Sequence, residues 1–351
     1  MLTALFVIFA NMMLSLLLSS FIFPAAPPVP KAADPVDTVS VAVIGDVMMH
    51  RRQLEFDHSV FLSGLTPLLS SADIAIANAE FSLGGSPYTG YPSFSAPDSY
   101  LQSILASGVD VLLTANNHVL DRGSDGLERT LRQYPSFAGA GLDEAQYLHN
   151  NPLILRKGGL RLALVNFTYG TNMAQGREYP KVSRMSRPEV ERQMKVAREN
   201  ADVVVALPHW GDEYVLRHNR KQEEWAKWLV EQGADVIIGS HPHVVQDTAH
   251  IKGVPVVYSL GNAVSNMSAR NTRLELAVTF RVLYHRISGK TVLEEPELHF
   301  MWCTLPGRKS DNYGTVFVEE MEGCRDAWLI PSDYDEMMAT YARVKKETGI
   351  K

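Results

Sequence analysis

Seven short, near-continuous apolar runs constrain the fold of this chain more than any other feature of its sequence. They occupy residues 39–45, 72–78, 109–115, 160–166, 201–207, 234–239 and 255–259. Runs of Val, Ile and Leu of this length are typical of buried strands covered on both faces. Helical patterns stand between them at residues 124–132, 187–200 and 222–232. Alternating strands and helices predict an α/β layered architecture.

The pattern changes beyond residue 269. Two longer segments, residues 272–283 and 291–302, show the alternation that is typical of antiparallel strands. A loop-rich stretch follows, and residues 332–346 have a helical pattern. The sequence therefore predicts a main domain over residues 38–305 and a C-terminal extension with a terminal helix over residues 306–351.

The N-terminal segment has a different composition from the rest of the chain. Residues 2–23 are mostly apolar and contain no charged side chain. A helix of that length, at about 1.5 Å per residue, matches the hydrocarbon thickness of a bilayer. We therefore expect residues 1–23 to be a transmembrane anchor or a signal peptide. The Pro-rich residues 24–37 predict an extended tether.

This leader predicts that the rest of the chain lies on the extracytoplasmic side, membrane-anchored or secreted. In that compartment Cys303 and Cys324 either form a disulfide or remain two unpaired thiols, and the sequence leaves both open. Two cysteines exclude a four-thiolate zinc site. The net charge of −6 supplies no basic excess for nucleic-acid phosphates, so we expect a membrane and no nucleic acid as a partner.

Polar side chains with metal-ligand chemistry stand at the carboxyl ends of six of the apolar runs. In chain order they are Asp46; Asn78 and Glu80; Asn116, Asn117 and His118; His209; His241 and His243; and Asn262. Taken singly, Asp46 also fits a turn or helix cap, and His209 also fits a core histidine. In an open α/β sheet, however, sites form where the carboxyl ends of the strands meet. We therefore predict that these residues converge on one site.

The donor set of this site combines carboxylates, amides and imidazoles. Such a set suits one or two divalent ions of borderline character, namely Mn, Zn or Fe. A carboxylate can bridge two ions, as it does in two-metal hydrolases. His241 and His243 form the strongest part of the pattern, because the proline between them stiffens their loop. His50 is a weak candidate because it lies close to Asp46 in the chain.

Six motifs stand in a fixed order across about residues 39–265. They are Gly45-Asp46-Val47-Met48, Asn78-Ala79-Glu80, Asn116-Asn117-His118-Val119-Leu120-Asp121, His209-Trp210-Gly211-Asp212-Glu213, Gly239-Ser240-His241-Pro242-His243 and Ser259-Leu260-Gly261-Asn262. Together they resemble the CapA family of capsule synthesis proteins, whose members take part in poly-γ-glutamate capsule production. That family is related to the calcineurin-like metallophosphoesterases.

The resemblance implies an α/β metallophosphoesterase-like layered sandwich with mixed β-sheets flanked by helices. It also implies that the metal ligands are Asp46, Glu80, Asn117, His209, His241 and His243, and that His118 is a candidate catalytic general acid. Two positions depart from the phosphoesterase pattern: Met48 replaces a histidine ligand, and Glu80 replaces the usual aspartate. Weaker candidates for substrate contact are Asn78, Asn116, Glu213 and Asn262.

Three functions are compatible with these features. The first is an extracytoplasmic, membrane-associated protein that serves capsule or poly-γ-glutamate synthesis, export or attachment, alongside other subunits of that synthesis. The second is a metal-dependent hydrolase of phosphate esters or of the γ-glutamyl polymer. The third is a non-catalytic scaffold subunit. The loop at residues 84–98, rich in Gly, Pro and aromatic residues, is either a substrate-contacting flap or a surface connection.

Overall fold

The computed structural model describes residues 34–350, and residues 36–350 belong to one compact unit. The expected leader at residues 1–23 and most of the expected tether lie outside the described residues. Val36 and Asp37, which we assigned to the tether, already belong to the first strand, β1 (Val36–Val47). None of the helices within residues 34–350 combines the length and the apolar character that crossing a membrane requires.

The first sheet is built around β1 and contains nine strands within the described residues. On one side β1 pairs in parallel with β2 (Ile74–Ala79), followed by β3 (Val111–Leu113) and β4 (Phe137–Ala138). On the other side β1 pairs antiparallel with β14 (Leu274–His285), followed by β16 (Glu297–Thr304) and β17 (Gly314–Phe317). Two short strands complete the sheet, β13 (Asn262–Val264) beside β1 and β15 (Thr291–Leu293) beside β14.

The second sheet has six strands among the described residues. Its order is β11 (Thr248–Ile251), β12 (Val254–Val257), β10 (Val236–Ile238), β9 (Val203–His209), β7 (Leu160–Thr168) and β6 (Leu153–Lys157). The four inner strands are parallel, and the outer two are antiparallel to their neighbours. A separate two-stranded pairing joins β5 (Ala140–Gly141) and β8 (Lys181–Val182).

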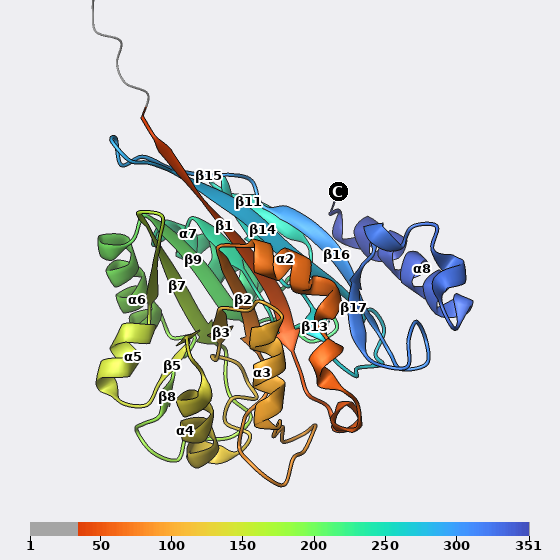
Figure 1. Ribbon diagram of the computed structural model, residues 1–351. Helices are drawn as coiled ribbons and strands as arrows, with labels where there is room; N and C mark the ends of the chain where they lie inside the picture. The colour runs from red at the N-terminus through yellow and green to blue at the C-terminus, as the bar shows by residue number, and fades with distance from the viewer. Residues whose placement is uncertain (1–33, 351) are drawn as a thin grey trace, which may run out of the picture. The chain divides into compact units, whose positions relative to one another are not determined.

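Helices cover the outer faces of the two sheets. Apolar side chains of α2 (Thr66–Ser71), α3 (Asp98–Ala106) and α4 (Gly123–Gln133) pack on the first sheet. Those of α6 (Arg187–Asn200) and α7 (Arg220–Glu231) pack on the second. Figure 1 shows α6 and α5 (Glu144–Asn150) on one side of the strands. In the same view α2 and α3 lie in front of the strands of the first sheet.

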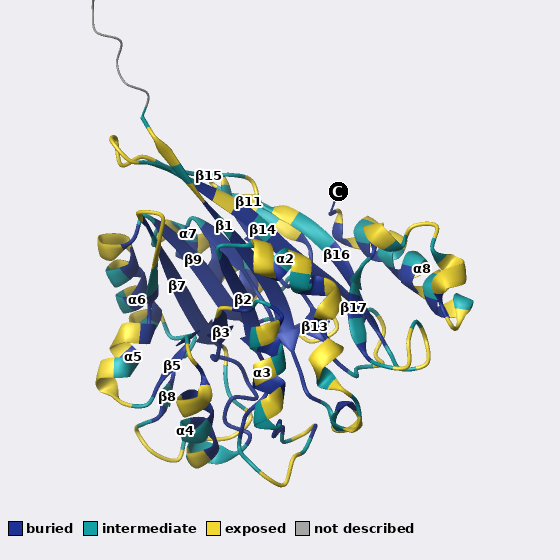
Figure 2. Ribbon diagram, in the orientation of Figure 1, coloured by how far each residue is buried: buried dark blue, intermediate teal, exposed yellow. Residues whose placement is uncertain are grey.

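A third apolar cluster fills the space between the sheets. It joins β1 side chains such as Val41 and Val43 to Leu164 of β7 and Val205 of β9. The last helix, α8 (Pro331–Thr348), adds Met337 and Val344 to the same cluster. Figure 2 shows the central strands of both sheets buried, with the exposed positions on helices, loops and the ends of outer strands. The predicted α/β layered sandwich with mixed, helix-flanked sheets is therefore confirmed.

Most predicted elements occur with boundaries shifted by a few residues, and α6 spans the expected residues 187–200. The expected strand at residues 291–302 is wrong, because it consists of β15 and β16 with Pro296 between them. A proline has no N–H to give to a sheet, so Pro296 stays outside the pairing, and β16 begins directly after it. Both cysteines are free: Cys303 is buried, with its Sγ 3.4 Å from the Ser265 carbonyl oxygen, and Cys324 is partly exposed. Short 3-10 helices are η1 (Arg51–Glu55), η2 (His58–Val60), η3 (Ser63–Leu65), η4 (Glu319–Met321) and η5 (Arg325–Ala327).

Candidate metal centre

The carboxyl ends of strands from both sheets meet at one edge of the sandwich. Asp46 lies near the end of β1, and Glu80 follows β2 directly. His209 is the last residue of β9, and its backbone forms a parallel bridge with Ser240, just before His241. The side chains that we expected to converge therefore come from two different sheets.

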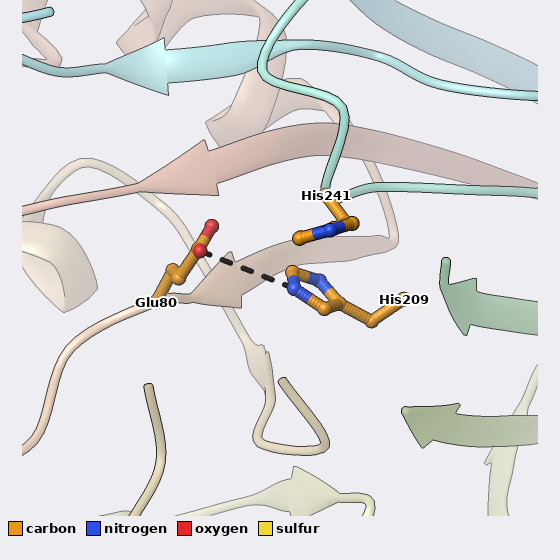
Figure 3. A group of neighbouring side chains, drawn as sticks. All are labelled: Glu80, His209 and His241. Carbon is orange, nitrogen blue, oxygen red and sulfur yellow. Dashed lines mark ion pairs between the residues drawn. The ribbon is translucent and has the colours of Figure 1, made fainter. Parts of the chain in front are cut away.

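Glu80 is at the centre of this edge. Its side chain is fully buried, and neither carboxylate oxygen has a hydrogen-bond partner within the described residues. Glu80 Oε1 lies 3.9 Å from His209 Nε2, the pair joined by the dashed line in Figure 3. It also lies 3.8 Å from His243 Nε2. A buried carboxylate without donors costs about 1–3 kcal/mol. A cation shared with the surrounding imidazoles would remove that cost.

Three sets of side chains in the described chain each bring ligand atoms within 4.8 Å of one another. They are Glu80 with His209 and His241, Asp46 with Glu80 and His243, and Glu213 with His241 and His243. Glu80 belongs to the first two sets, so its carboxylate is common to two of the candidate ligand groups. Asn117 Oδ1 lies 2.8 Å from His209 Nε2, which puts the predicted amide ligand beside the first set.

The protonation of these groups also suits a cation. Burial, followed by the other imidazoles, lowers the pKa of His209 well below its usual range and that of His241 to about 3. Both rings are therefore neutral at pH 7, as metal ligands must be. Burial, then the charge of Asp46, raises the pKa of Glu80, so this carboxyl binds a proton more tightly than a free glutamate does, and a metal ion would compete with that proton.

His243 behaves differently from the other two histidines. Burial lowers its pKa, but the hydrogen bond to Asp46, the charge of Asp46 and the hydrogen bond to Asn262 together outweigh burial and leave the pKa raised. Its Nδ1 lies 3.3 Å from Asp46 Oδ2 and 2.9 Å from Asn262 Oδ1. These two acceptors orient the ring so that Nε2 faces Glu80. The arrangement matches the usual support of a metal-ligating imidazole by a carboxylate or amide.

The predicted substrate contacts Asn78, Asn116 and Asn262 are all buried and bonded to neighbouring groups. Asn78 Nδ2 donates to Asp46 Oδ1 at 2.7 Å, and Asn116 Nδ2 donates to the Ala79 carbonyl at 2.9 Å. These bonds fix the orientation of the candidate ligands. Glu213, by contrast, is exposed at the opening of the site.

His118 lies beside the ligands, and the structure adds a partner that the sequence reasoning missed. His118 Nδ1 is 2.7 Å from Asp121 Oδ2, which also accepts the Phe94 N–H at 2.8 Å. Because a carboxylate only accepts, Nδ1 carries the hydrogen and Nε2 is the nitrogen left for proton transfer. The spacing of three residues between His118 and Asp121 was the signal available in the sequence.

Three exposed tyrosines stand around the opening of the site. The Tyr91 ring lies 6.3 Å from His118, the Tyr169 ring 4.6 Å from His241, and the Tyr214 ring 6.3 Å from His243, measured between ring centroids. Tyr91 belongs to the loop at residues 84–98, so that loop borders the site. None of these three tyrosines was predicted as a site residue, because aromatic side chains in loops follow no periodic pattern in the sequence.

The backbone at the site is strained. Five non-glycine residues of the described chain have positive φ, and three of them are at this edge: Tyr214 at 66°, His241 at 102° and His243 at 57°. Such conformations cost of order 1–3 kcal/mol each and occur most often at functional sites. The Tyr214 N–H donates to the Pro242 carbonyl at 2.8 Å, which ties the loop of Glu213 to the loop of the two histidines.

The fold and this edge define an α/β sandwich protein with a candidate divalent-metal centre between its two sheets. The chain belongs to the family described as bacterial capsule synthesis protein PGA_cap, whose model matches residues 40–267. The family predicted from the six motifs is therefore confirmed.

Two curated relatives are similar over most of this chain. Capsule biosynthesis protein CapA of Bacillus anthracis is 27% identical over 278 residues, covering 74% of this chain and 66% of that protein. PGA biosynthesis protein CapA of Bacillus subtilis strain 168 is 28% identical over 317 residues, covering 84% of this chain and 80% of that protein. Among solved structures, a phosphatase of Mycoplasma pneumoniae has 15% identity and a TM-score of 0.47, covering 76% of this chain and 94% of that chain.

Proposed function

We propose that this chain is an extracytoplasmic, membrane-associated protein of capsule or poly-γ-glutamate polymer synthesis, export or attachment, and that it acts through a divalent-metal centre at the strand ends. The family membership supports the capsule role. The observation that supports the metal centre is Glu80, a fully buried carboxylate without donors among three imidazoles. The uncharged leader at residues 2–23 motivates the membrane association.

The residues present fit one or two ions of Mn, Zn or Fe. Asp46, Glu80, Asn117, His209, His241 and His243 would hold them. When bound, a divalent ion polarises a carbonyl or phosphoryl oxygen or lowers the pKa of water. The chain's own contribution is then to exclude solvent at buried ligands and to hold His118, through Asp121, at the wall of the cavity, where the ring can give a proton to a leaving group once Nε2 is protonated.

Metal content of the purified full chain tests this proposal. We expect Mn, Zn or Fe at about one or two ions per chain in the wild type, measured by plasma mass spectrometry, and loss of the metal in the double variant His241→Ala with His243→Ala. The double variant His149→Ala with His250→Ala removes two exposed histidines as a matched control. A wild type without metal, or equal loss in the control, contradicts the metal centre.

A metal-dependent hydrolase of phosphate esters or of the γ-glutamyl polymer is the second candidate function. The observation that favours it is the buried His118–Asp121 pair beside the ligands, because an oriented imidazole serves proton transfer and is not needed to hold a metal. Assays with phosphomonoester, phosphodiester and poly-γ-glutamate substrates in the presence of Mn test it. Activity that disappears in His118→Asn, with metal content unchanged, supports catalysis.

A scaffold subunit without catalysis makes the opposite prediction. In that case His118→Asn leaves polymer production by cells intact, whereas removal of the leader abolishes it. Partners are then other subunits of capsule or polymer synthesis, which co-purification of the tagged chain from membranes would reveal.

A further inference from the structure

Two connected cavities lie beside the candidate metal centre. The inner one, of about 390 Å³, is lined by His118, Glu213 and His243 of the site, together with residues of the opening. The outer one, of about 500 Å³, is lined by His50, Arg51, Arg52, Glu55, Tyr91 and Asn266. His50, Tyr91 and Asn266 line both cavities, so the two form one groove. Each volume falls in the range of about 300–1,000 Å³ that holds small ligands.

The outer cavity carries an excess of positive charge. Arg51 and Arg52 are exposed at the start of η1, and neither guanidinium makes an ion pair or hydrogen bond within residues 34–350. Other arginines of the described chain, such as Arg129, Arg161 and Arg273, are paired with carboxylates. Only Glu55 opposes the two charges in this cavity, although the whole chain has a net charge of −6.

His50 extends this polar lining toward the metal centre. Its Nε2 is buried and has no hydrogen-bond partner in the described chain. The ring packs edge-on against Phe94, at 5.2 Å between centroids, and Phe94 in turn packs against His118 at 4.7 Å. His50 lines both cavities, so this unpaired ring nitrogen belongs to a residue that the two cavities share.

The wall of the groove is held in place by tight backbone packing. Gly90 lies so close to η1 that a Cβ at this position would be 2.2 Å from the Arg51 nitrogen and 2.9 Å from the His50 carbonyl carbon. The loop that carries the exposed Tyr91 therefore rests directly on the residues that carry the basic groups. Tyr91 lines both cavities, and its ring lies 6.3 Å from the His118 ring.

We propose that this groove is an anion subsite, in which Arg51 and Arg52 bind a carboxylate or phosphate group of a ligand whose other end lies at the metal centre. Arginine suits this role because its planar fork matches both oxyanions. The inference rests on the proposed metal function, which places one end of the ligand at the metal centre. It adds a second contact, between Arg51 and Arg52 and an anionic group at the other end of the ligand, that would determine specificity.

Calorimetric titration of the metal-loaded full chain tests the subsite. The probes are triglutamate for carboxylates and glycerol 3-phosphate for phosphate, with triglutamine, which lacks the side-chain carboxylates, and glycerol as their counterparts. We expect Arg51→Gln with Arg52→Gln to weaken at least one anionic probe by about tenfold. Loss for triglutamate alone identifies a carboxylate ligand, and loss for glycerol 3-phosphate alone identifies a phosphate.

A matched control is the pair Arg156→Gln with Lys157→Gln. These adjacent basic residues lie at the end of β6, paired with the start of β7, and therefore at the opposite end of the second sheet from His209. The control should bind as the wild type does. Equal affinity of wild type and the Arg51/Arg52 variant for both probes, no binding to the wild type, or the same loss in the control would overturn the subsite.

Metal content and urea unfolding of the same samples separate this inference from the proposed function. Both arginines are exposed, so the variant should keep the wild-type unfolding midpoint and the wild-type metal content. A wild type that holds no metal contradicts the metal function, while the comparison of probe affinities still decides whether Arg51 and Arg52 bind anions.

Discussion

Replacing Glu80 by glutamine should make the metal-free protein more stable. Burial, and then the charge of Asp46, raise the pKa of Glu80 well above its usual 4.5. The folded state therefore binds this proton more tightly than the unfolded state, and stability falls as the pH rises above 4.5. At pH 7, about 2.5 pH units higher, the loss is at most about 3 kcal/mol at 1.36 kcal/mol per unit.

The glutamine side chain has nearly the same shape and no proton to lose. We expect metal-free Glu80→Gln to be about 1–3 kcal/mol more stable than wild type at pH 7, with the difference falling below about 1 kcal/mol at pH 5. Urea unfolding of chelator-treated protein at the two pH values measures this difference. Added Mn²⁺ should then stabilise the wild type and leave the variant nearly unchanged, because binding to the folded state alone adds stability.

Glu275 supplies a matched control. It is also fully buried, both of its carboxylate oxygens lack partners in the described chain, and burial raises its pKa despite the nearby Arg273. It belongs to none of the three candidate ligand sets. Glu275→Gln should therefore stabilise the metal-free protein at pH 7 and keep the full response to Mn²⁺. The reasoning is refuted if metal-free Glu80→Gln is less stable than wild type, or if the two variants respond alike to the metal.

Two further substitutions test the walls of the site. Gly90→Ala should lower the free energy of unfolding by about 1–3 kcal/mol, since its Cβ would clash with the Arg51 nitrogen. Gly170→Ala is its control: no atom lies within 4 Å of the added Cβ, so the free energy of unfolding should change by less than about 0.5 kcal/mol. Equal effects of the two substitutions in urea unfolding would contradict the packing argument. Asp121→Ala should cost about 2–4 kcal/mol, because it leaves the buried Phe94 N–H and His118 Nδ1 without their acceptor; an unchanged unfolding midpoint would show that these bonds contribute nothing.

Much of the candidate site is predictable because strand ends are predictable. Asp46, Glu80 and Asn117 lie at or just beyond the carboxyl ends of β1, β2 and β3, which are parallel neighbours in the first sheet, so their side chains emerge at the same edge. His209 and His241 follow neighbouring strands of the other sheet for the same reason. Whether the two edges meet depends on how the apolar faces pack between the sheets. Periodicity alone does not predict that packing, whereas the family resemblance implied the layered sandwich and one shared ligand set.

The parts that the sequence reasoning missed are those fixed by loop packing. Asp121, Tyr169 and Tyr214 reach the site through turns whose course depends on contacts far along the chain, such as the bond from the Tyr214 N–H to Pro242. The basic groove is of the same kind, because the loop at Gly90 and the residues at Arg51 meet only in the folded protein. Pro296, by contrast, was visible in the sequence and marks where the expected strand divides.

The left-handed backbone at His241 and His243 sets a direction for laboratory evolution. Glycine adopts positive φ without steric cost, so His241→Gly would relieve local strain while deleting a candidate ligand. A library selected for heat resistance alone, without metal in the medium, should therefore enrich glycine at position 241. The same library selected with metal present should keep histidine there, because metal binding by the imidazole then offsets the strain of its positive φ. The residue found at position 241 after selection therefore shows whether metal binding or backbone strain determined stability under the conditions used.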